Sequence, residues 1–494
     1  MSYNNRIPSG IQGVDEILNG GFIQSSCYLL VGATGTGKTI FSLQWLKEMK
    51  GKKGSSLFIS IAEPVESIRR NAEDFRWDLD SIAFEDLTFR PAVEGTEFDE
   101  YGIFTPSEVE EEPLWKKIYD AIDKNNPKYL VIDSLTYLRY LSTDEYQFRK
   151  HIQRLVNWLN SKNCTTLLLL ELSDLEKDVS VSLAVDGVVI LRREVSEGRL
   201  IDIRSLEVAK LRGSSYISGR HPLKITENGI KVFPHIIEKI KHIAYARKQI
   251  SSGIKELDEI LYGGIQTGIS TLISGPSGTG KTTLALQYLV SAADQGLKSV
   301  LYSFEEGKSS ILERCNAIGI PVEEKIENNM VEIVEVNTLE LYPDEFLMAM
   351  KNEVKENKRS LIVIDSLRGY NLAMEQFGYI VPHIQNIINY CRMNKLNLFL
   401  INELEKLTGE LQITETGVSY IADLVLMLRY AEYNGEVIKI ISCLKNRIGN
   451  HEPELREYKI TEKGILIGEK LDHLRGLLTG VPTAETPEKK PEIS

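Results

Sequence analysis

The feature that most constrains this chain is a phosphate-binding loop pattern that occurs twice. A glycine, four residues and Gly-Lys-Thr run from Gly32 to Thr39 and again from Gly275 to Thr282. Each copy follows an apolar run and precedes a helical pattern. Glycines let successive backbone N–H groups turn toward a polyphosphate, and the N-terminus of the next helix adds positive charge. A chance match in a glycine-rich loop does not account for two copies in the same context, so the sequence predicts two ATP sites.

The residue types in each loop indicate how ATP and Mg²⁺ would be held. The two lysines would reach the β- and γ-phosphates, and the hydroxyls of Thr39 and Thr282 would bind Mg²⁺. In the first half, the predicted ATP-binding residues of the loop are Gly35, Thr36, Gly37, Lys38, Thr39 and Ile40. In the second half they are Ser277, Gly278, Thr279, Gly280, Lys281, Thr282 and Thr283.

Each half also contains a continuous apolar run that ends in an aspartate. The runs are Tyr129 to Asp133 and Leu361 to Asp365. Such runs are typical of parallel strands buried on both faces, and they place Asp133 and Asp365 at the carboxyl edge of the sheet beside the phosphate loops. Each aspartate is therefore predicted to hold the Mg²⁺ shell through water.

The two halves are related by an internal duplication. The segment Ser9 to Leu18 is echoed by Ser252 to Leu261, at the same offset of about 243 residues that relates the two loop lysines. Strands alternate with helices, for example Leu57 to Ile61 and then Val65 to Asp74. We therefore expect two α/β domains in tandem, each a doubly wound, parallel or mixed sheet flanked by helices.

The 494 residues exceed what one hydrophobic core usually serves. We expect a first domain over residues 1–234, a linker over 235–248, a second domain over 249–470, and a C-terminal loop and disordered tail over 471–494. From lysine to aspartate the first half is about eleven residues longer than the second. The acidic segment from Glu94 to Glu112 is the candidate insertion, and we expect it to be a solvated surface loop.

Composition excludes several classes of protein. The five cysteines are scattered singly, which favours free thiols over a metal site or disulfides. The net charge of −12 argues against a nucleic-acid surface across the chain. The first ten residues are polar and the apolar runs are too short to cross a bilayer, so we expect a soluble cytoplasmic protein with no membrane partner.

Hydrolysis or transfer of phosphate requires a base that takes a proton from the nucleophile. The best candidates end the strand after each phosphate loop. The second half has Glu305 and Glu306 there, whereas the first half has Ala62 and Glu63. One carboxylate can still orient and deprotonate a water, so we expect Glu63 to support hydrolysis in the first half, and Glu305 and Glu306 are the candidate catalytic residues of the second.

These motifs together resemble the KaiC family, the two-domain ATPases and autokinases of circadian clocks, whose domains are similar to the RecA fold. The resemblance rests on both loops, the repeated openings, the glutamates at the strand ends, Trp77 to Leu79 and Lys210 to Tyr216, and it covers nearly the whole chain. It implies a homo-hexameric double ring with ATP between neighbouring subunits and Mg²⁺ as cofactor.

The resemblance also implies residues that reach a neighbour's ATP and residues that accept phosphate. The first group is Lys210, Leu211, Arg212, Ser214 and Tyr216 in the first half, and Lys445, Arg447 and His451 in the second. Ser419 matches the acceptor serine and Thr414 a nearby threonine that relays phosphate. Tyr420 replaces the acceptor threonine and is a weaker candidate. Residues 471 to 483 resemble a regulatory loop. A KaiB-like partner is a candidate, whereas the short tail argues against a KaiA-like activator.

Two further functions stay open from the sequence. A RecA-like DNA-binding ATPase is disfavoured by the acidic charge and by the lack of basic, glycine-rich loops. A hexameric signalling scaffold would bind ATP between subunits with little turnover. Substitution of either loop lysine by alanine, followed by phosphate-release measurements, separates an enzyme from a scaffold.

Overall fold

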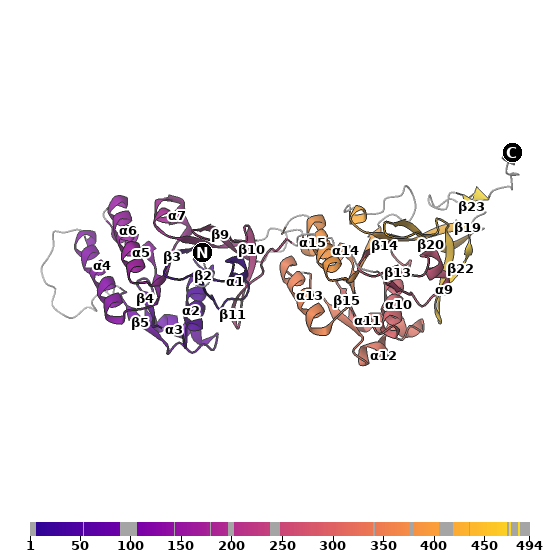
Figure 1. The fold of residues 1–494 in the computed structure, drawn as a ribbon, viewed down its shortest axis with the longest axis horizontal. Coiled ribbons are helices and arrows are strands. Elements are labelled where there is room, and N and C mark those ends of the chain that lie inside the picture. The colour runs from indigo at the N-terminus through magenta and orange to yellow at the C-terminus, as the bar shows by residue number, and fades with distance from the viewer. Residues whose placement is uncertain are drawn as a thin grey trace. The chain divides into compact units, whose positions relative to one another are not determined.

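The structure is a computed structural model of the chain. It describes residues 6–52, 54–88, 106–142, 144–177, 179–195, 202–237, 248–338, 341–374, 377, 380–404, 418–433, 435–471, 474–475 and 483–484. The chain divides into two compact units, Met1–Ile236 and Ile237–Ser494 (Figure 1). The segment expected to link the domains falls largely on residues 238–247, outside the described residues.

The described part of the first unit alternates strands and helices. Its elements are β1 (Arg6–Ile7), α1 (Val14–Ile17), β2 (Phe22–Ile23), β3 (Cys27–Gly32), α2 (Lys38–Glu48), β4 (Ser56–Ser60), α3 (Val65–Glu73), β5 (Ile82–Asp86), α4 (Pro106–Asn125), β6 (Tyr129–Asp133), α5 (Leu135–Leu141), α6 (Glu145–Ser161), β7 (Thr165–Leu170), α7 (Leu172–Lys177), α8 (Ser180–Ala184), β8 (Gly187–Val195), β9 (Asp202–Leu211), β10 (Arg220–Thr226) and β11 (Gly229–Val232).

The main sheet of the first unit is mixed. Its described strands follow the order β11-β10-β9-β8-β3-β7-β6-β4-β5. The strands from β8 to β5 are parallel, whereas β8, β9, β10 and β11 form an antiparallel meander. The chain leaves β3 through α2 and returns in β4, with β7 and β6 between the two strands in the sheet. In such sheets, ligands bind outside the carboxyl ends of the strands at this point of the topology.

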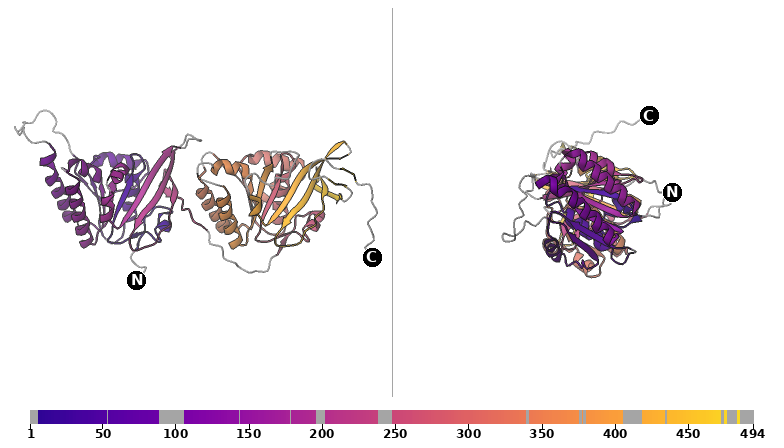
Figure 2. Two further views of the ribbon diagram at one scale, coloured as in Figure 1. Left: turned by 90° about the horizontal axis from the view of Figure 1, so that it is seen from above. Right: turned by 90° about the vertical axis from the view of Figure 1, so that its left-hand side faces the viewer.

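Helices cover both faces of this sheet (Figure 2), and β3 shows why its sequence is continuously apolar. Tyr28 and Leu30 pack with α1, α2 and α3 on one face, whereas Cys27, Leu29 and Val31 pack with α4, α5 and α6 on the other. Both sets alternate along the strand because successive side chains point to opposite faces. The β3 strand is therefore buried on both sides, as a central parallel strand should be.

The described part of the second unit repeats this arrangement. Its elements are β12 (Gln249–Ile250), α9 (Lys255–Ile260), β13 (Ile265–Gln266), β14 (Ser270–Pro276), α10 (Lys281–Asp294), β15 (Ser299–Ser303), α11 (Lys308–Ala317), α12 (Val322–Glu327), β16 (Val331–Glu335), α13 (Pro343–Asn357), β17 (Leu361–Asp365), α14 (Leu367–Met374), α15 (Ile380–Met393), β18 (Asn397–Leu404), η1 (Val418–Tyr420), β19 (Leu424–Tyr433), β20 (Glu436–Asn446), β21 (Arg456–Thr461), β22 (Gly464–Lys470), β23 (Leu474–Arg475) and β24 (Thr483–Ala484).

The second sheet has the described order β16-β15-β17-β18-β14-β19-β20-β21-β22, which matches the first strand for strand. Its core also forms two layers, with α9, α10, α11 and α12 on one face and α13, α14 and α15 on the other. The expectation of two tandem α/β domains with mixed sheets is confirmed.

The described residues also bear on the acidic segment, the cysteines and the apolar helices considered in the sequence. Helix α4 begins at Pro106, so the end of the acidic segment is helical and the expectation of a loop is wrong there. Residues 94–105 of that segment lie outside the described residues. All five cysteines are free and buried. Within the described ranges, no helix is long and apolar enough to span a bilayer.

Candidate functional site

Each unit carries a cavity at the carboxyl edge of its sheet, bordered by the phosphate loop. The loop ends in a glycine with positive φ, +101° at Gly37 and +96° at Gly280, and the helix begins at the next residue. Only glycine adopts this conformation readily. Neither helix has a side-chain cap at this end. Backbone N–H groups of the first turn therefore stay free to bind an anion.

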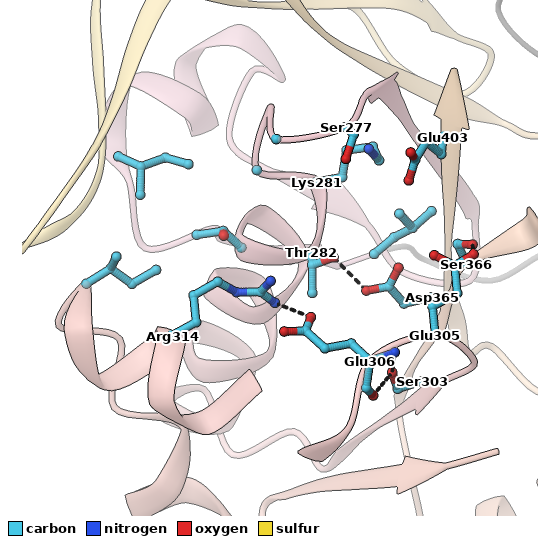
Figure 3. A pocket seen from close by; sticks show the side chains of 16 residues that line it. Ser277, Lys281, Thr282, Ser303, Glu305, Glu306, Arg314, Asp365, Ser366 and Glu403 are labelled. Atoms are coloured by element: carbon cyan, nitrogen blue, oxygen red, sulfur yellow. Dashed lines mark hydrogen bonds and ion pairs between the residues drawn. The ribbon is translucent and has the colours of Figure 1, made fainter. Parts of the chain in front are cut away.

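In both sites the hydroxyl after the loop lysine contacts the strand aspartate. Thr39 Oγ1 donates to Asp133 Oδ2 at 2.8 Å, and Thr282 Oγ1 donates to Asp365 Oδ2 at 2.6 Å (Figure 3). A hydroxyl oxygen beside a carboxylate is a donor set that suits Mg²⁺. The residues present therefore fit the cofactor implied by the sequence.

The loop lysines bind groups of the protein itself. Lys38 Nζ donates to the carbonyl of Gly32 at 2.7 Å and forms an ion pair with Glu171 Oε1 at 2.6 Å. Lys281 Nζ donates to the carbonyl of Pro276 at 2.9 Å. Glu403 lines the second cavity and favours the charged form of Lys281 electrostatically. ATP would replace these contacts with phosphate oxygens.

Burial shifts the ionisation of the two strand-end aspartates and of one lysine. The pKa of Asp365 is raised to about 6, mainly by burial and also by the neighbouring Glu305 carboxylate, whereas Thr282, Lys281 and Arg314 oppose the shift. Burial also raises the pKa of Asp133 and lowers the pKa of Lys281. Each site therefore disfavours its own charges until ligands of opposite charge enter.

The two glutamates of the second site have different partners. Glu305 Oε1 accepts a hydrogen bond from Ser366 Oγ, next to Asp365. Glu306 accepts from Ser310 Oγ at 2.7 Å and forms an ion pair with Arg314 at 2.9 Å. Figure 3 shows Glu305 beside Ser366 and Glu306 directed toward Arg314. Glu305 is therefore the carboxylate nearer to the metal-binding pair.

In the first site only the counterpart of Glu306 is present. Glu63 Oε1 accepts from Ser67 Oγ at 2.7 Å and from Asn71 Nδ2 at 3.2 Å. Asn71 stands where the second site has Arg314, and Ala62 stands where it has Glu305. The first site thus lacks the cation Arg314 and the carboxylate Glu305 of the second site.

The two cavities differ in size and lining. The first has a volume of about 560 Å³, and Phe75 and Trp77 are among the residues that line it. The two rings stack with centroids 4.8 Å apart. The second has a volume of about 330 Å³, and Ile318 lies where the first has Phe75. An aromatic wall that suits a purine is present in the first cavity.

The residues expected to reach a neighbour's ATP do not line the cavity of their own unit. Lys210 donates to the carbonyls of Ser182 and Val185 at 2.6 and 2.7 Å, and Arg212 donates to Leu183 at 2.8 Å. Ser214 accepts from Arg6. Leu211 is buried, whereas Tyr216 and His451 are half-buried.

The second unit repeats this cation arrangement at the turn that carries the expected phosphoacceptor. Lys445 donates to the backbone carbonyls of Ser419 at 3.0 Å and Ala422 at 2.7 Å. Arg447 donates to the backbone carbonyl of Tyr420 at 2.7 Å. Ser419 is half-buried, and Tyr420 is 60% exposed. Thr414 lies outside the described residues.

Sequence reasoning did not single out two glutamates of the cavities, one directly after β7 and one at the end of β18. Glu171 and Glu403 line the first and second cavities, respectively. The signal was available, because each follows an apolar run as Asp133 and Asp365 do. Arg314 carries no comparable signal, because its ion pair depends on the angle at which α11 meets the cavity.

The chain was compared with known proteins. A family model described as "ATPase: KaiC" matches residues 7–236 and 250–472. The circadian clock oscillator protein KaiC of Picosynechococcus sp. is 31% identical over 502 residues, which cover 99% of this chain and 94% of the relative. The protein of that name from Synechococcus elongatus is 30% identical over 497 residues, with 98% and 93% covered.

These matches agree with the geometry of both sites. The family model spans each unit with its phosphate loop, its metal-binding pair and its strand-end glutamate. The relatives match over almost the full length of both chains, so the similarity is not confined to the loops. The chain therefore belongs to the KaiC family of ATPases, with two tandem RecA-like domains that bind ATP.

Proposed function

We propose that this ATPase also phosphorylates itself on Ser419, and that it works as a hexameric timing or signalling switch. The observation that carries the proposal is the anchoring of the turn Val418–Tyr420 by Lys445 and Arg447. Two cations therefore contact the backbone of the turn that carries Ser419. Cations that neutralise phosphoryl oxygens belong beside the nucleophile of a phosphate transfer.

The transfer uses the second site of a neighbouring subunit. Ser419 Oγ attacks the γ-phosphorus, the bond to the β,γ-bridging oxygen breaks, and ADP leaves. Glu305 accepts the serine proton because it lies beside the metal-binding pair, whereas Glu306 is held by Arg314. Mg²⁺, held by Thr282 with Asp365 acting through water, would neutralise charge on the β- and γ-phosphates.

In the first site we propose hydrolysis of ATP, with Glu63 orienting the attacking water. Lys210 and Arg212 would serve the neighbour's first site as Lys445 and Arg447 serve its second. The role as a timing switch and a KaiB-like partner rest on the relatives, which carry the name circadian clock oscillator.

The test of self-phosphorylation is mass spectrometry of the tryptic peptide 407–429 after incubation with Mg-ATP. We expect one phosphate on Ser419. Glu305→Gln should slow its appearance by at least about 100-fold, since general bases contribute that much or more. Glu306→Gln should slow it less. Unmodified peptide from a protein that holds ATP would instead favour the scaffold.

A further inference from the structure

The first site lacks a carboxylate at the place where the second has its best candidate base. Glu305 and Ala62 are related by the same offset that relates Lys281 and Lys38. In the second site, Glu305 lines the cavity together with Asp365 and Lys281, and its Oε1 accepts a hydrogen bond from Ser366, the residue after Asp365. The methyl group of Ala62 can do neither.

Glu63 occupies the position of Glu306 rather than that of Glu305, although it lines the first cavity and acts electrostatically on Asp133. Its Oε1 accepts hydrogen bonds from Ser67 and Asn71, which hold that oxygen toward α3. Glu306 has the same relation to Ser310 and Arg314 in the second site. Glu63 is thus the counterpart of the outer glutamate.

Glu171 supplies a carboxylate to the first site from another strand. It directly follows β7, which pairs in parallel with β3, so their carboxyl ends meet at one edge. Its Oε1 lies 2.6 Å from Lys38 Nζ, and its backbone N–H donates to Thr136 Oγ1 at 2.9 Å, which fixes its position. Glu171 lines the first cavity together with Lys38 and Asp133, as Glu305 lines the second together with Lys281 and Asp365. Glu403 holds the position of Glu171 in the second cavity, so Glu171 is the carboxylate that remains beside the lysine where Ala62 has replaced the other one.

The side chain of Glu171 is 28% exposed, so water reaches it. We propose that Glu171 is the catalytic base of the first site. This inference rests on the proposed hydrolysis there. The water oxygen forms a bond to the γ-phosphorus, the bond to the β,γ-bridging oxygen breaks, the water proton passes to Glu171, and the proton then goes to the departing phosphate.

This role predicts opposite effects on binding and on turnover. When Lys38 binds the phosphates, its ion pair with Glu171 must open. Glu171→Gln removes that competing charge and lowers the negative potential around the γ-phosphate, so ATP should bind about 3- to 10-fold more tightly. Loss of the base should slow hydrolysis by about 100-fold or more. A residue that only supports the fold would weaken both when replaced.

The experiment uses full-length protein with Glu305→Gln, which slows turnover at the second site. Phosphate release measures hydrolysis at the first site. Affinity for the slowly hydrolysed analogue adenosine 5′-(β,γ-imido)triphosphate is followed by the change in tryptophan fluorescence on binding, because Trp77 lines the first cavity and no tryptophan lines the second. Glu171→Gln should give slower release and tighter binding. Ala62→Glu in the same protein should restore release at least about 10-fold, because it returns a carboxylate beside Ser134, the counterpart of Ser366.

Glu176→Gln is the matched control. Glu176 is exposed on α7, the short helix that directly follows Glu171, and carries the same charge as Glu171, but it does not line the cavity. It should change neither quantity by more than about twofold, since surface substitutions of this kind have small effects. Glu403→Gln in protein with an intact Glu305 should slow the second site much less than Glu171→Gln slows the first.

Three outcomes overturn the inference. Hydrolysis at the reference rate in Glu171→Gln shows that another group takes the proton. Loss of both binding and turnover shows a structural role. If the Glu305→Gln reference binds the analogue but releases no phosphate, the proposed hydrolysis itself is wrong, and the inference falls with it.

Discussion

Several charged side chains in the two cavities are buried, and burial disfavours their charge. Bound ligands of opposite charge would offset this cost. Asp365 is the clearest case, because burial and Glu305 raise its pKa from 3.8 to about 6. At neutral pH this carboxylate is charged in a place that disfavours charge. An empty site of this kind binds a cation readily but reduces the stability of the fold.

We expect Asp365→Asn to stabilise the ligand-free protein at pH 7.5 by about 3 kcal/mol at most, since each unit of pKa shift corresponds to about 1.4 kcal/mol. The sign follows from the raised pKa: the folded protein holds the proton more tightly than the unfolded chain. The destabilisation by Asp365 is therefore absent below about pH 3.8 and grows as the pH rises to about 6.

Urea unfolding in EDTA at pH 5 and pH 7.5 measures this difference between the variant and the wild type. The gain should be about half as large at pH 5, because the folded wild type is then mostly protonated at Asp365. An equal gain at both values would contradict the assignment of the shift to this carboxyl.

At the scale of elements, the helix after the glutamate decides what that glutamate contacts. Residues four and eight positions later lie on one face of α3 or α11. The first unit places Ser67 and Asn71 there, and the second places Ser310 and Arg314. An asparagine in the first unit and an arginine in the second stand at this helix position. The glutamate therefore accepts a hydrogen bond from a neutral side chain in the first unit and forms an ion pair in the second.

Arg314 already favours the charged form of Asp365, so its field extends across the second cavity. We expect Arg314→Asn to weaken ATP binding at the second site about fivefold, since a cation there attracts the triphosphate. The reciprocal Asn71→Arg should strengthen binding at the first site by a similar factor. Isothermal titration at low and high salt checks both.

The salt dependence is the sharper part of that measurement. It should decrease in Arg314→Asn and increase in Asn71→Arg, because exposed charges are screened by added ions. Identical salt dependence in all three proteins would show that Arg314 serves only to hold Glu306.

The sequence was sufficient for much of this architecture. The paired loops, the apolar runs and the repeated openings fix two α/β units and place Asp133 and Asp365 beside Thr39 and Thr282, because strand ends and helix starts are encoded locally. The contact of Glu171 with Lys38 could not be read in the same way. It depends on which strand lies next to β3, and strand order is set by packing of the whole sheet. Likewise, periodicity does not specify that Lys210 and Lys445 contact carbonyls of α8 and of the turn at Ser419.

At the scale of the whole molecule, the cations expected at a subunit interface are bound to backbone carbonyls of their own chain. A carbonyl carries only a partial charge, so the phosphates of a neighbour's ATP would displace it easily. Assembly in which Lys210 and Arg212 contact the next subunit would therefore depend on nucleotide.

We expect the wild type to form a hexamer with Mg-ATP and smaller species without it, as measured by multi-angle light scattering. Lys38→Ala should shift the distribution toward the smaller species, since it removes the main contact of the first loop with the triphosphate. Arg212→Ala should do the same while leaving the cavity of its own unit intact. Lys116→Ala, on an exposed position of α4, is the control of equal charge and should still assemble. A hexamer that forms equally well without nucleotide would contradict this account.

The stacked pair Phe75 and Trp77 has a practical consequence for chemical control of this molecule. An inhibitor that mimics ATP and carries an added flat ring would find a surface to stack on in the first half and an aliphatic wall in the second. Such a compound would silence one half of the chain and spare the other, so the contribution of each half could be switched off in living cells without altering the gene.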